Sequence, residues 1–253
     1  THAHHNVRDL PSLLQEGDVL VVNNTKVIPA LLIGERGLGK AKFTLLKQLG
    51  SDRWSAFAKP AKKCPVGTMV RFSEDFSCEV VEVEEGGGVV IAFNLSGTAL
   101  DEAILRYGAM PLPPYIKRPD GTDGDDDSHY QTMFAKHSGS VAAPTAGLHF
   151  TSELKSALRD KSIHFEEVTL HVVAGTFLPV KVENIHDHKM HSEWGSLDAE
   201  TATLLTKARA EGRRIICVGT TSLRILETIW QKFKGFEAYQ GETDIFITPG
   251  FEI

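Results

Sequence analysis

The segment Ala143-Pro-Thr-Ala-Gly-Leu-His-Phe-Thr151 joins two kinds of sequence pattern. Pro144 fixes one φ angle, and Gly147 permits backbone conformations that other residues avoid. Thr151 is a good helix N-cap, because apolar residues follow at helical spacing from Leu154 onward. The segment is therefore predicted to be a shaped loop that runs into a helix N-terminus, where an anion or an oxygen-rich ligand can bind. A plain turn is the alternative, because ordinary loops also use proline and glycine.

The chain beyond this segment alternates between helix and strand patterns. We expect helices over 152–160, over 199–211 and from about 221, and strands over 163–173, 214–218 and 244–248. Near the N-terminus, the apolar run Asp18–Val22 is typical of a strand buried on both faces. Strands alternating with helices predict an α/β domain with a mostly parallel sheet and covering helices.

Residues 31–109 have a different pattern. Short strand-like runs at 41–48, 53–59, 68–72, 77–85 and 89–94 are separated by turn signals rich in glycine and proline. This pattern predicts a small all-β, barrel-like domain inserted into the α/β domain, whose two parts are then residues 1–30 and 110–253.

The composition excludes several classes of protein. The chain has 253 residues with a formal net charge of -6, and no apolar run approaches the ~20 residues of a membrane span. The three cysteines are far apart, which predicts neither a zinc knuckle nor a disulfide framework and fits a reducing cytoplasm. Lys59, Lys62 and Lys63 form a basic cluster that is either plain solvated surface or a phosphate-contact patch.

Polar residues follow the predicted strands, where open α/β sheets bind ligands. His171 ends a strand on its more polar face, and the hydroxyl-rich Gly219–Ser222 turn leads into a helix that carries Arg224. The predicted substrate-binding residues are Asn23, Asn24, Thr25, Lys26, Pro144, Thr145, Gly147, Gly175, Thr176, Gly219, Thr220, Thr221, Ser222 and Arg224. Polar turns and satisfied structural side chains remain the alternative for each group.

A histidine-rich stretch runs from Ile185 to Trp194. It lacks the i, i+4 histidine pair that places two metal ligands on one helical face, so we expect no metal. General acid–base work by His191 or Glu193 is the favoured role. No Walker A loop and no Gly-x-Gly-x-x-Gly after a strand are present, which argues against an ordinary nucleotide-binding Rossmann site.

Taken together, these segments resemble the S-adenosylmethionine:tRNA ribosyltransferase-isomerases of queuosine biosynthesis. The matching pieces cover essentially the whole chain in collinear order. They are Gly17-Asp-Val-Leu-Val-Val-Asn-Asn-Thr-Lys-Val-Ile-Pro-Ala30, Met110-Pro-Leu-Pro-Pro-Tyr-Ile116, Val141–Thr151, Val168-Thr-Leu-His171, Ala174-Gly-Thr-Phe177, His188-Lys-Met-His-Ser-Glu193, Val218-Gly-Thr-Thr-Ser-Leu-Arg224 and Gly241-Glu-Thr-Asp-Ile-Phe-Ile247.

The resemblance implies a reaction. The ribosyl moiety of S-adenosylmethionine is transferred to 7-aminomethyl-7-deazaguanine in a tRNA anticodon and isomerised to give epoxyqueuosine, while adenine and methionine leave. It further implies an α/β domain with a β-barrel, no tightly bound cofactor and a cytoplasmic enzyme, which we expect to be a monomer. The sulfonium acidifies the C5′ proton, so a general base and proton donors are needed. The residues proposed for these roles are His171, Glu193, His191, His149 and Asp244.

The sequence departs from the family pattern at Leu31, where arginine is usual, and at Val173, where glycine is usual. The family also has a segment before this sequence and an Asn-Phe-His-Leu-Pro region after it, so the expected site is incomplete here. Two other functions stay open on these grounds. One is a tRNA-binding relative without transferase activity, and the other is an acyl or glycosyl transferase that acts without RNA.

Overall fold

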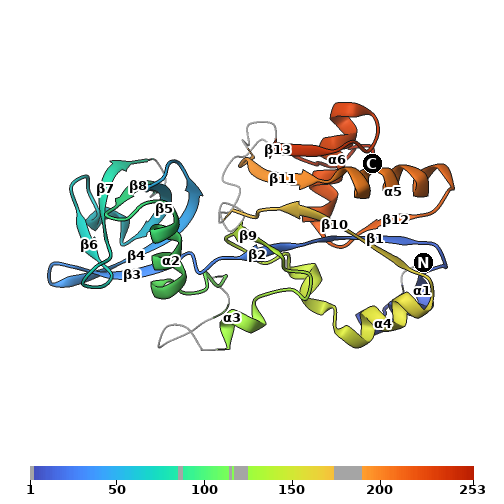
Figure 1. The fold of residues 1–253 in the computed structure, drawn as a ribbon, viewed down its shortest axis with the longest axis horizontal. Helices are drawn as coiled ribbons and strands as arrows, with labels where there is room; N and C mark the ends of the chain where they lie inside the picture. The colour runs from blue at the N-terminus through green and yellow to red at the C-terminus, as the bar shows by residue number, and fades with distance from the viewer. Residues whose placement is uncertain (1–2, 85–87, 114–115, 117–124, 174–189) are drawn as a thin grey trace. The chain divides into compact units, whose positions relative to one another are not determined.

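The computed structural model describes residues 3–84, 88–113, 116, 125–173 and 190–253 (Figure 1). The chain divides into two compact units. The first comprises Thr1–Lys26, Gln131–Val172 and Val180–Ile253, and the second comprises Val27–Tyr130 and Val173–Pro179. The predicted domain limits of 31 and 109 differ from these bounds, because the second unit continues to Tyr130.

The second unit contains the barrel that the sequence predicts. Its strands are β3 (Leu31–Arg36), β4 (Gly39–Gln48), β5 (Arg53–Lys59), β6 (Met69–Arg71), β7 (Ser77–Val83) and β8 (Gly88–Phe93). They close in the order β3-β4-β5-β8-β7-β6, and neighbouring strands of the barrel pair antiparallel. Alternate side chains point inward, and Phe43, Leu45 and Phe76 are fully buried there.

Two elements of this unit were missed. Strand β3 was not predicted, and α2 (Gly97–Tyr107) lies in a region that was interpreted as all β. The helical signal was present, because Leu100, Ala103 and Ile104 recur at helical spacing and are the buried residues of α2. The short helix η2 (Ala61–Lys63) follows β5.

The first unit is built on a five-stranded sheet in the order β12-β1-β10-β11-β13. Its strands are β1 (Val19–Asn23), β10 (His164–Leu170), β11 (Glu193–Leu197), β12 (Ile215–Cys217) and β13 (Tyr239–Thr243). β1 pairs in parallel with β10 and β12, whereas β11 pairs antiparallel with β10 and β13. The sheet is therefore mixed, and the prediction of a mostly parallel sheet fails at β11 and β13.

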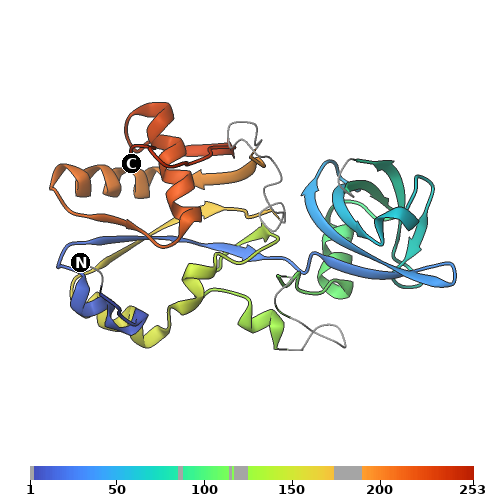
Figure 2. The ribbon, with the colours of Figure 1, turned by 180° about the vertical axis from the view of Figure 1, so that it is seen from behind.

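Helices lie on both faces of this sheet. Figures 1 and 2 show α5 (Ala199–Ala210) and α6 (Thr220–Phe233) on one side, and α1 (Leu10–Leu13) and α4 (Ser152–Asp160) on the other. Val19 and Val21 of β1 pack in the cluster with α5 and α6, whereas Leu20 and Val22 pack in the cluster with α4. All five residues of β1 are buried, as a strand covered on both faces requires.

The capped helices agree with the sequence. Helix α4 spans the predicted 152–160, and the Thr151 hydroxyl accepts a hydrogen bond from the Leu154 N–H (3.2 Å). The Asp198 carboxylate caps α5 through the N–H of Thr201 (2.7 Å).

Within the described ranges, no helix has the length and apolar character that a membrane crossing requires.

Several strands differ from the prediction. Residues 244–248 form no strand, and β13 instead ends at Thr243. Strands β2 (Thr25–Val27) and β9 (His137–Ser140), which pair with each other, were not predicted. The remaining short elements are η1 (Val7–Asp9), α3 (Asp126–His129) and η4 (Thr145–His149).

Candidate active site

One edge of the sheet collects most of the predicted site residues. Strands β1, β10 and β12 are parallel, so their carboxyl ends share an edge. Antiparallel β11 begins at that same edge with Glu193, and β13 ends there with Thr243, its partner in register. Chain topology therefore brings the segments that follow Asn23, Leu170, Cys217 and Thr243 to one side of the unit.

Asn23 and Asn24 tie β1 to β10. The Asn23 amide donates to Leu170 O (3.0 Å) and accepts from the N–H groups of Leu170 and Thr25 (both 3.1 Å). The side-chain oxygen of Asn24 (Oδ1) accepts from the Thr169 hydroxyl (2.8 Å), and the side-chain nitrogen (Nδ2) donates to the Glu167 carboxylate (3.1 Å). Because both side chains are already hydrogen-bonded within the protein, substrate contact by Asn23 and Asn24 is not favoured.

His171 is held from three sides. Its Nδ1 lies 2.7 Å from the hydroxyl oxygen of Thr25, whose side chain is fully buried. Its ring stacks on Trp194, with the ring centroids 5.1 Å apart and the planes inclined by 19°. On the third side, a Cβ at Gly139 would lie 2.8 Å from His171 Nε2, so only glycine allows this approach. The imidazole therefore has one fixed orientation.

The environment of His171 favours its neutral form. Burial lowers the pKa of the imidazole below its ordinary value of 6.5, and the nearby charge of His137 lowers it further. A neutral imidazole has one nitrogen lone pair to accept a proton. With the pKa below 6.5, that lone pair is available at neutral pH.

Glu193 and Arg224 form a buried ion pair. Glu193 is 2% exposed, and its carboxylate accepts a hydrogen bond from Arg224 Nη1. Arg224 Nη2 donates to the carbonyl oxygens of His191 (3.3 Å) and Thr243 (3.4 Å). The guanidinium thus ties α6 to β11 and β13. This geometry does not favour Glu193 as a base or Arg224 as a ligand for the substrate carboxylate, because each charge is already paired.

The loop before α4 contacts the loop before α6. Residues 145–149 form η4, and a Cβ at Gly219 would lie 2.9 Å from the Cβ of Ala146. Gly219 has φ +90°, which L side chains avoid, and it is the N-cap of α6. Gly147 is buried against Thr132 in the same way. Both predicted glycine loops therefore lie side by side at this edge.

The remaining predicted residues differ in exposure. Ser222 is buried and its hydroxyl donates to Val218 O (3.5 Å), whereas the buried Thr221 Oγ1 has no hydrogen-bond partner among the described residues. Pro144 is buried too. The exposed members are Lys26, Thr145, His149, His191, Thr220 and Asp244. Gly175 and Thr176, like His186 and His188, lie outside the described residues.

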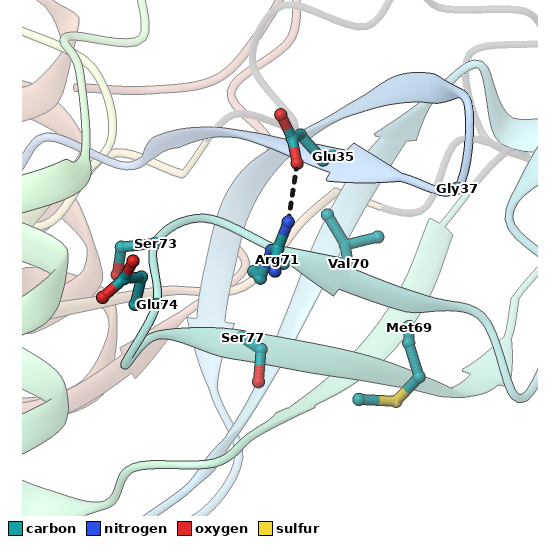
Figure 3. Close-up of a pocket in the computed structure, with 8 residues that line it drawn as sticks. All are labelled: Glu35, Gly37, Met69, Val70, Arg71, Ser73, Glu74 and Ser77. Carbon is teal, nitrogen blue, oxygen red and sulfur yellow. Dashed lines mark hydrogen bonds and ion pairs between the residues drawn. The ribbon is translucent and has the colours of Figure 1, made fainter.

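The described residues contain no group of three or more histidine, cysteine, aspartate or glutamate side chains placed to hold a metal ion. A hollow on the barrel is lined by Glu35, Gly37, Met69, Val70, Arg71, Ser73, Glu74 and Ser77 (Figure 3). None of these is a predicted site residue, and the Arg71–Glu35 ion pair across it (3.1 Å) is exposed.

Comparison with known proteins assigns the chain to a family. The model of the family described as "Queuosine biosynthesis protein" matches residues 1–253. The chain belongs to this family.

Relatives within the queuosine biosynthesis family are similar over nearly the whole chain. A protein of Methylocella silvestris named S-adenosylmethionine:tRNA ribosyltransferase-isomerase is 53% identical over 252 residues, covering 97% of this chain and 70% of that protein. One of the same name from Maricaulis maris is 50% identical, covering 98% of this chain and 72% of its own. The crystal structure of an S-adenosylmethionine tRNA ribosyltransferase from Thermotoga maritima is 30% identical, covers 97% and 66% of the two chains, and has a TM-score of 0.40.

The sequence-based prediction of the queuosine biosynthesis family is thus confirmed, and with it the assignment as a transferase-isomerase enzyme. Leu31, one of the two departures from the family pattern, begins barrel strand β3 and exchanges backbone hydrogen bonds with Ala109 (3.0 and 2.9 Å). Val173, the other departure, is half-buried. Gly139 and Trp194 were not predicted as neighbours of His171, because both contacts depend on strands β9 and β11, which the sequence analysis missed.

Proposed function

We propose that this protein transfers the ribosyl moiety of S-adenosylmethionine to 7-aminomethyl-7-deazaguanine in tRNA and isomerises it to epoxyqueuosine, with release of adenine and methionine. Family membership supports the reaction type, since the curated relatives carry the name of this activity. The observation that carries the proposal is His171, an oriented imidazole with a lowered pKa at the ligand-binding edge of the sheet.

We assign His171 the role of general base at C5′ of the substrate. The positive sulfonium acidifies the C5′ protons, so a base near neutrality is sufficient. When Nδ1–H donates to the Thr25 hydroxyl, the lone pair of Nε2 is free to take the proton. The imidazolium that forms is stacked on the indole of Trp194, whose ring face attracts a cation.

The amino-acid carboxylate of the substrate suits the N-terminus of α6. The first N–H groups of a helix lack intrahelical partners, and the helix dipole favours an anion there. Thr220 is exposed at this end, and the hydroxyl of Thr221 has no partner in the part of the chain that the structure describes. The exposed His149, His191 and Asp244 are proposed as proton donors for ring opening and for the loss of adenine. No metal and no tightly bound cofactor enter this scheme.

The test is adenine release from S-adenosylmethionine by the full-length protein, measured with tRNA that carries 7-aminomethyl-7-deazaguanine, with the same tRNA carrying guanine, and without RNA. We expect release only with the modified tRNA. Release that does not depend on RNA would identify a transferase or hydrolase for small molecules. Binding of the modified tRNA without adenine release would identify a non-catalytic relative.

A further inference from the structure

One side of the barrel carries an unpaired group of lysines, which we call the lysine face. Lys40 and Lys42 lie on β4, Lys59 ends β5, and Lys62 and Lys63 lie in η2 directly after it; all five are exposed. None of the five has a hydrogen-bond or ion-pair partner among the residues that the structure describes. The sequence analysis identified only Lys59, Lys62 and Lys63 as a basic cluster. Lys40 and Lys42 join them because β4 pairs with β5.

The register places two of these charges directly opposite each other. Lys42 on β4 pairs with Lys59 on β5. Like charges opposite each other on one face of an antiparallel pair are destabilising. On its other side Lys42 is opposite the uncharged Ile33 of β3, so no carboxylate relieves the repulsion there. Because the Lys42–Lys59 pair does not stabilise the fold, its presence favours a role in binding an anionic partner.

The acidic residue that is opposite Lys40 in register is already engaged. Glu35 is opposite Lys40 in register, but its carboxylate forms an ion pair with Arg71 at 3.1 Å. Figure 3 shows the two side chains joined across the hollow. On β8, which borders β5, the outward-facing partners of Ser55 and Arg53 are Val90 and Ala92. The lysine face therefore spans β4, β5 and η2 without an acidic neighbour in the registered pairs of those strands other than Glu35.

The opposite wall of the barrel has the opposite charge. In the closed order β3-β4-β5-β8-β7-β6, strand β7 lies across the barrel from β4. Glu79 and Glu82 are exposed on β7, and Glu74 is exposed just before it. Such a separation of charge orients the barrel in the field of a polyanion, because one wall is attracted while the other is repelled.

We infer that the lysine face is a docking surface for the phosphate backbone of RNA. Lysine is a flexible point charge that contacts phosphates without reading bases, which suits a positioning contact rather than a specificity contact. Neighbouring strands lie about 4.8 Å apart, and alternate residues of one strand are about 6.7 Å apart along the backbone, so the lysines are close enough to contact several phosphates of one RNA backbone. The inference deepens the proposed function and rests on it only in naming tRNA as the RNA in question.

The test compares three variants of the full-length protein. The first is Lys42→Gln/Lys59→Gln/Lys62→Gln, which removes three of the five charges of the lysine face. The second is the same triple replacement by arginine, which keeps the charge. The third is Glu79→Gln/Glu82→Gln on the opposite wall, which changes net charge with no effect on the lysine face. Circular dichroism and thermal unfolding establish that each variant is folded.

Binding of unmodified tRNA transcript is measured by fluorescence anisotropy from about 50 to 300 mM salt. We expect the glutamine triple to weaken binding about tenfold and to reduce the slope of log Kd against log salt by roughly 2 to 3, since each lost phosphate contact removes about 0.7–0.9. The arginine triple is expected to bind like the parent. The Glu79/Glu82 variant is expected to change binding by less than about twofold.

Three results overturn the inference. The salt dependence of tRNA binding could be unchanged in the glutamine triple, or the Glu79/Glu82 variant could change tRNA affinity as much as the glutamine triple does in the opposite direction. In the third, the glutamine triple loses binding to phosphatidylserine vesicles but keeps its affinity for RNA. The last would assign the face to lipid. Adenine release separates this inference from the proposed function. With saturating modified tRNA, the glutamine triple should keep kcat and raise KM for tRNA. A parent protein that binds tRNA through this face without releasing adenine would refute only the proposed function.

Discussion

The Nδ1 atom of His171 lies 2.7 Å from the Oγ1 atom of Thr25, a contact that joins the residue after strand β10 to the first residue of strand β2. The two residues are 146 positions apart in the chain. Their contact depends on the parallel pairing of β1 with β10, in which Asn23 is the partner of Val168. The fold thereby fixes which nitrogen of the imidazole faces the Thr25 hydroxyl.

Loss of the Thr25 hydroxyl should impair catalysis more than folding. Thr25→Val keeps the shape of a fully buried side chain but removes the partner of Nδ1. We expect kcat for adenine release to fall about 10- to 100-fold, as is usual when the residue that orients an imidazole is lost. Thr25→Ser keeps the hydroxyl and should retain most of the activity. Equal loss in both variants would mean that the hydroxyl alone does not account for the effect.

A methyl group at Gly139 should displace the His171 ring. In Gly139→Ala the new Cβ would lie 2.8 Å from Nε2, and the backbone there has φ +148°. We expect a loss of turnover of at least about 100-fold, since the reacting nitrogen is moved from its position. Gly37→Ala is the matched control, because it also has positive φ but no atom within 4 Å of the new Cβ. If Gly139→Ala keeps full turnover, Nε2 is not the reacting atom.

The pH profile of kcat/KM should follow the titration of His171. A general base works in its neutral form, so activity is present above its pKa and is lost as pH falls through it. Because burial lowers this pKa below 6.5, the acid limb should lie below pH 6.5. His137→Gln removes the second cause and should move the limb toward higher pH, still below 6.5 because burial is the larger effect. A limb above pH 6.5 in the parent protein would exclude His171 as the titrating group.

The Glu193–Arg224 pair should contribute to stability rather than to proton transfer. Both side chains are nearly inaccessible, so removing one partner leaves a buried charge alone. Glu193→Gln or Arg224→Met should each lower the free energy of unfolding by about 3 kcal/mol or more, and the double variant should be less destabilised than the sum of the two. Denaturant unfolding measures this directly. Strict additivity would show that the two residues do not act as a pair.

Local patterns predicted the parts of the fold whose physics is local. The buried strand β1 shows itself as a continuous apolar run, and Thr151 and Asp198 mark the starts of α4 and α5 as N-caps. The barrel was recognised from the spacing of its turn signals. These features need no knowledge of what lies across the sheet.

Strands held by distant polar contacts were not predictable in this way. The sequence of β11 is Glu-Trp-Gly-Ser-Leu, and its first residue is a buried glutamate that is ion-paired with Arg224 on α6. Similarly, β13 is rich in polar residues, so the strand was predicted in the more apolar run after it, at residues 244–248. The sequence was sufficient to name His171 and Glu193 as candidate bases. The structure was needed to show that Glu193 is engaged in an ion pair, whereas His171 contacts the neutral hydroxyl of Thr25.

Adenine release by His171→Gln in the full-length protein, with S-adenosylmethionine and tRNA carrying 7-aminomethyl-7-deazaguanine, tests the central claim most directly. Glutamine keeps a polar side chain of similar length, and binding of both substrates is measured first to show that the site is intact. If His171 is the general base, single-turnover release falls by about 100-fold or more while both Kd values stay near those of the parent. Release at a near-parental rate with normal binding would contradict the account and place the base on another residue.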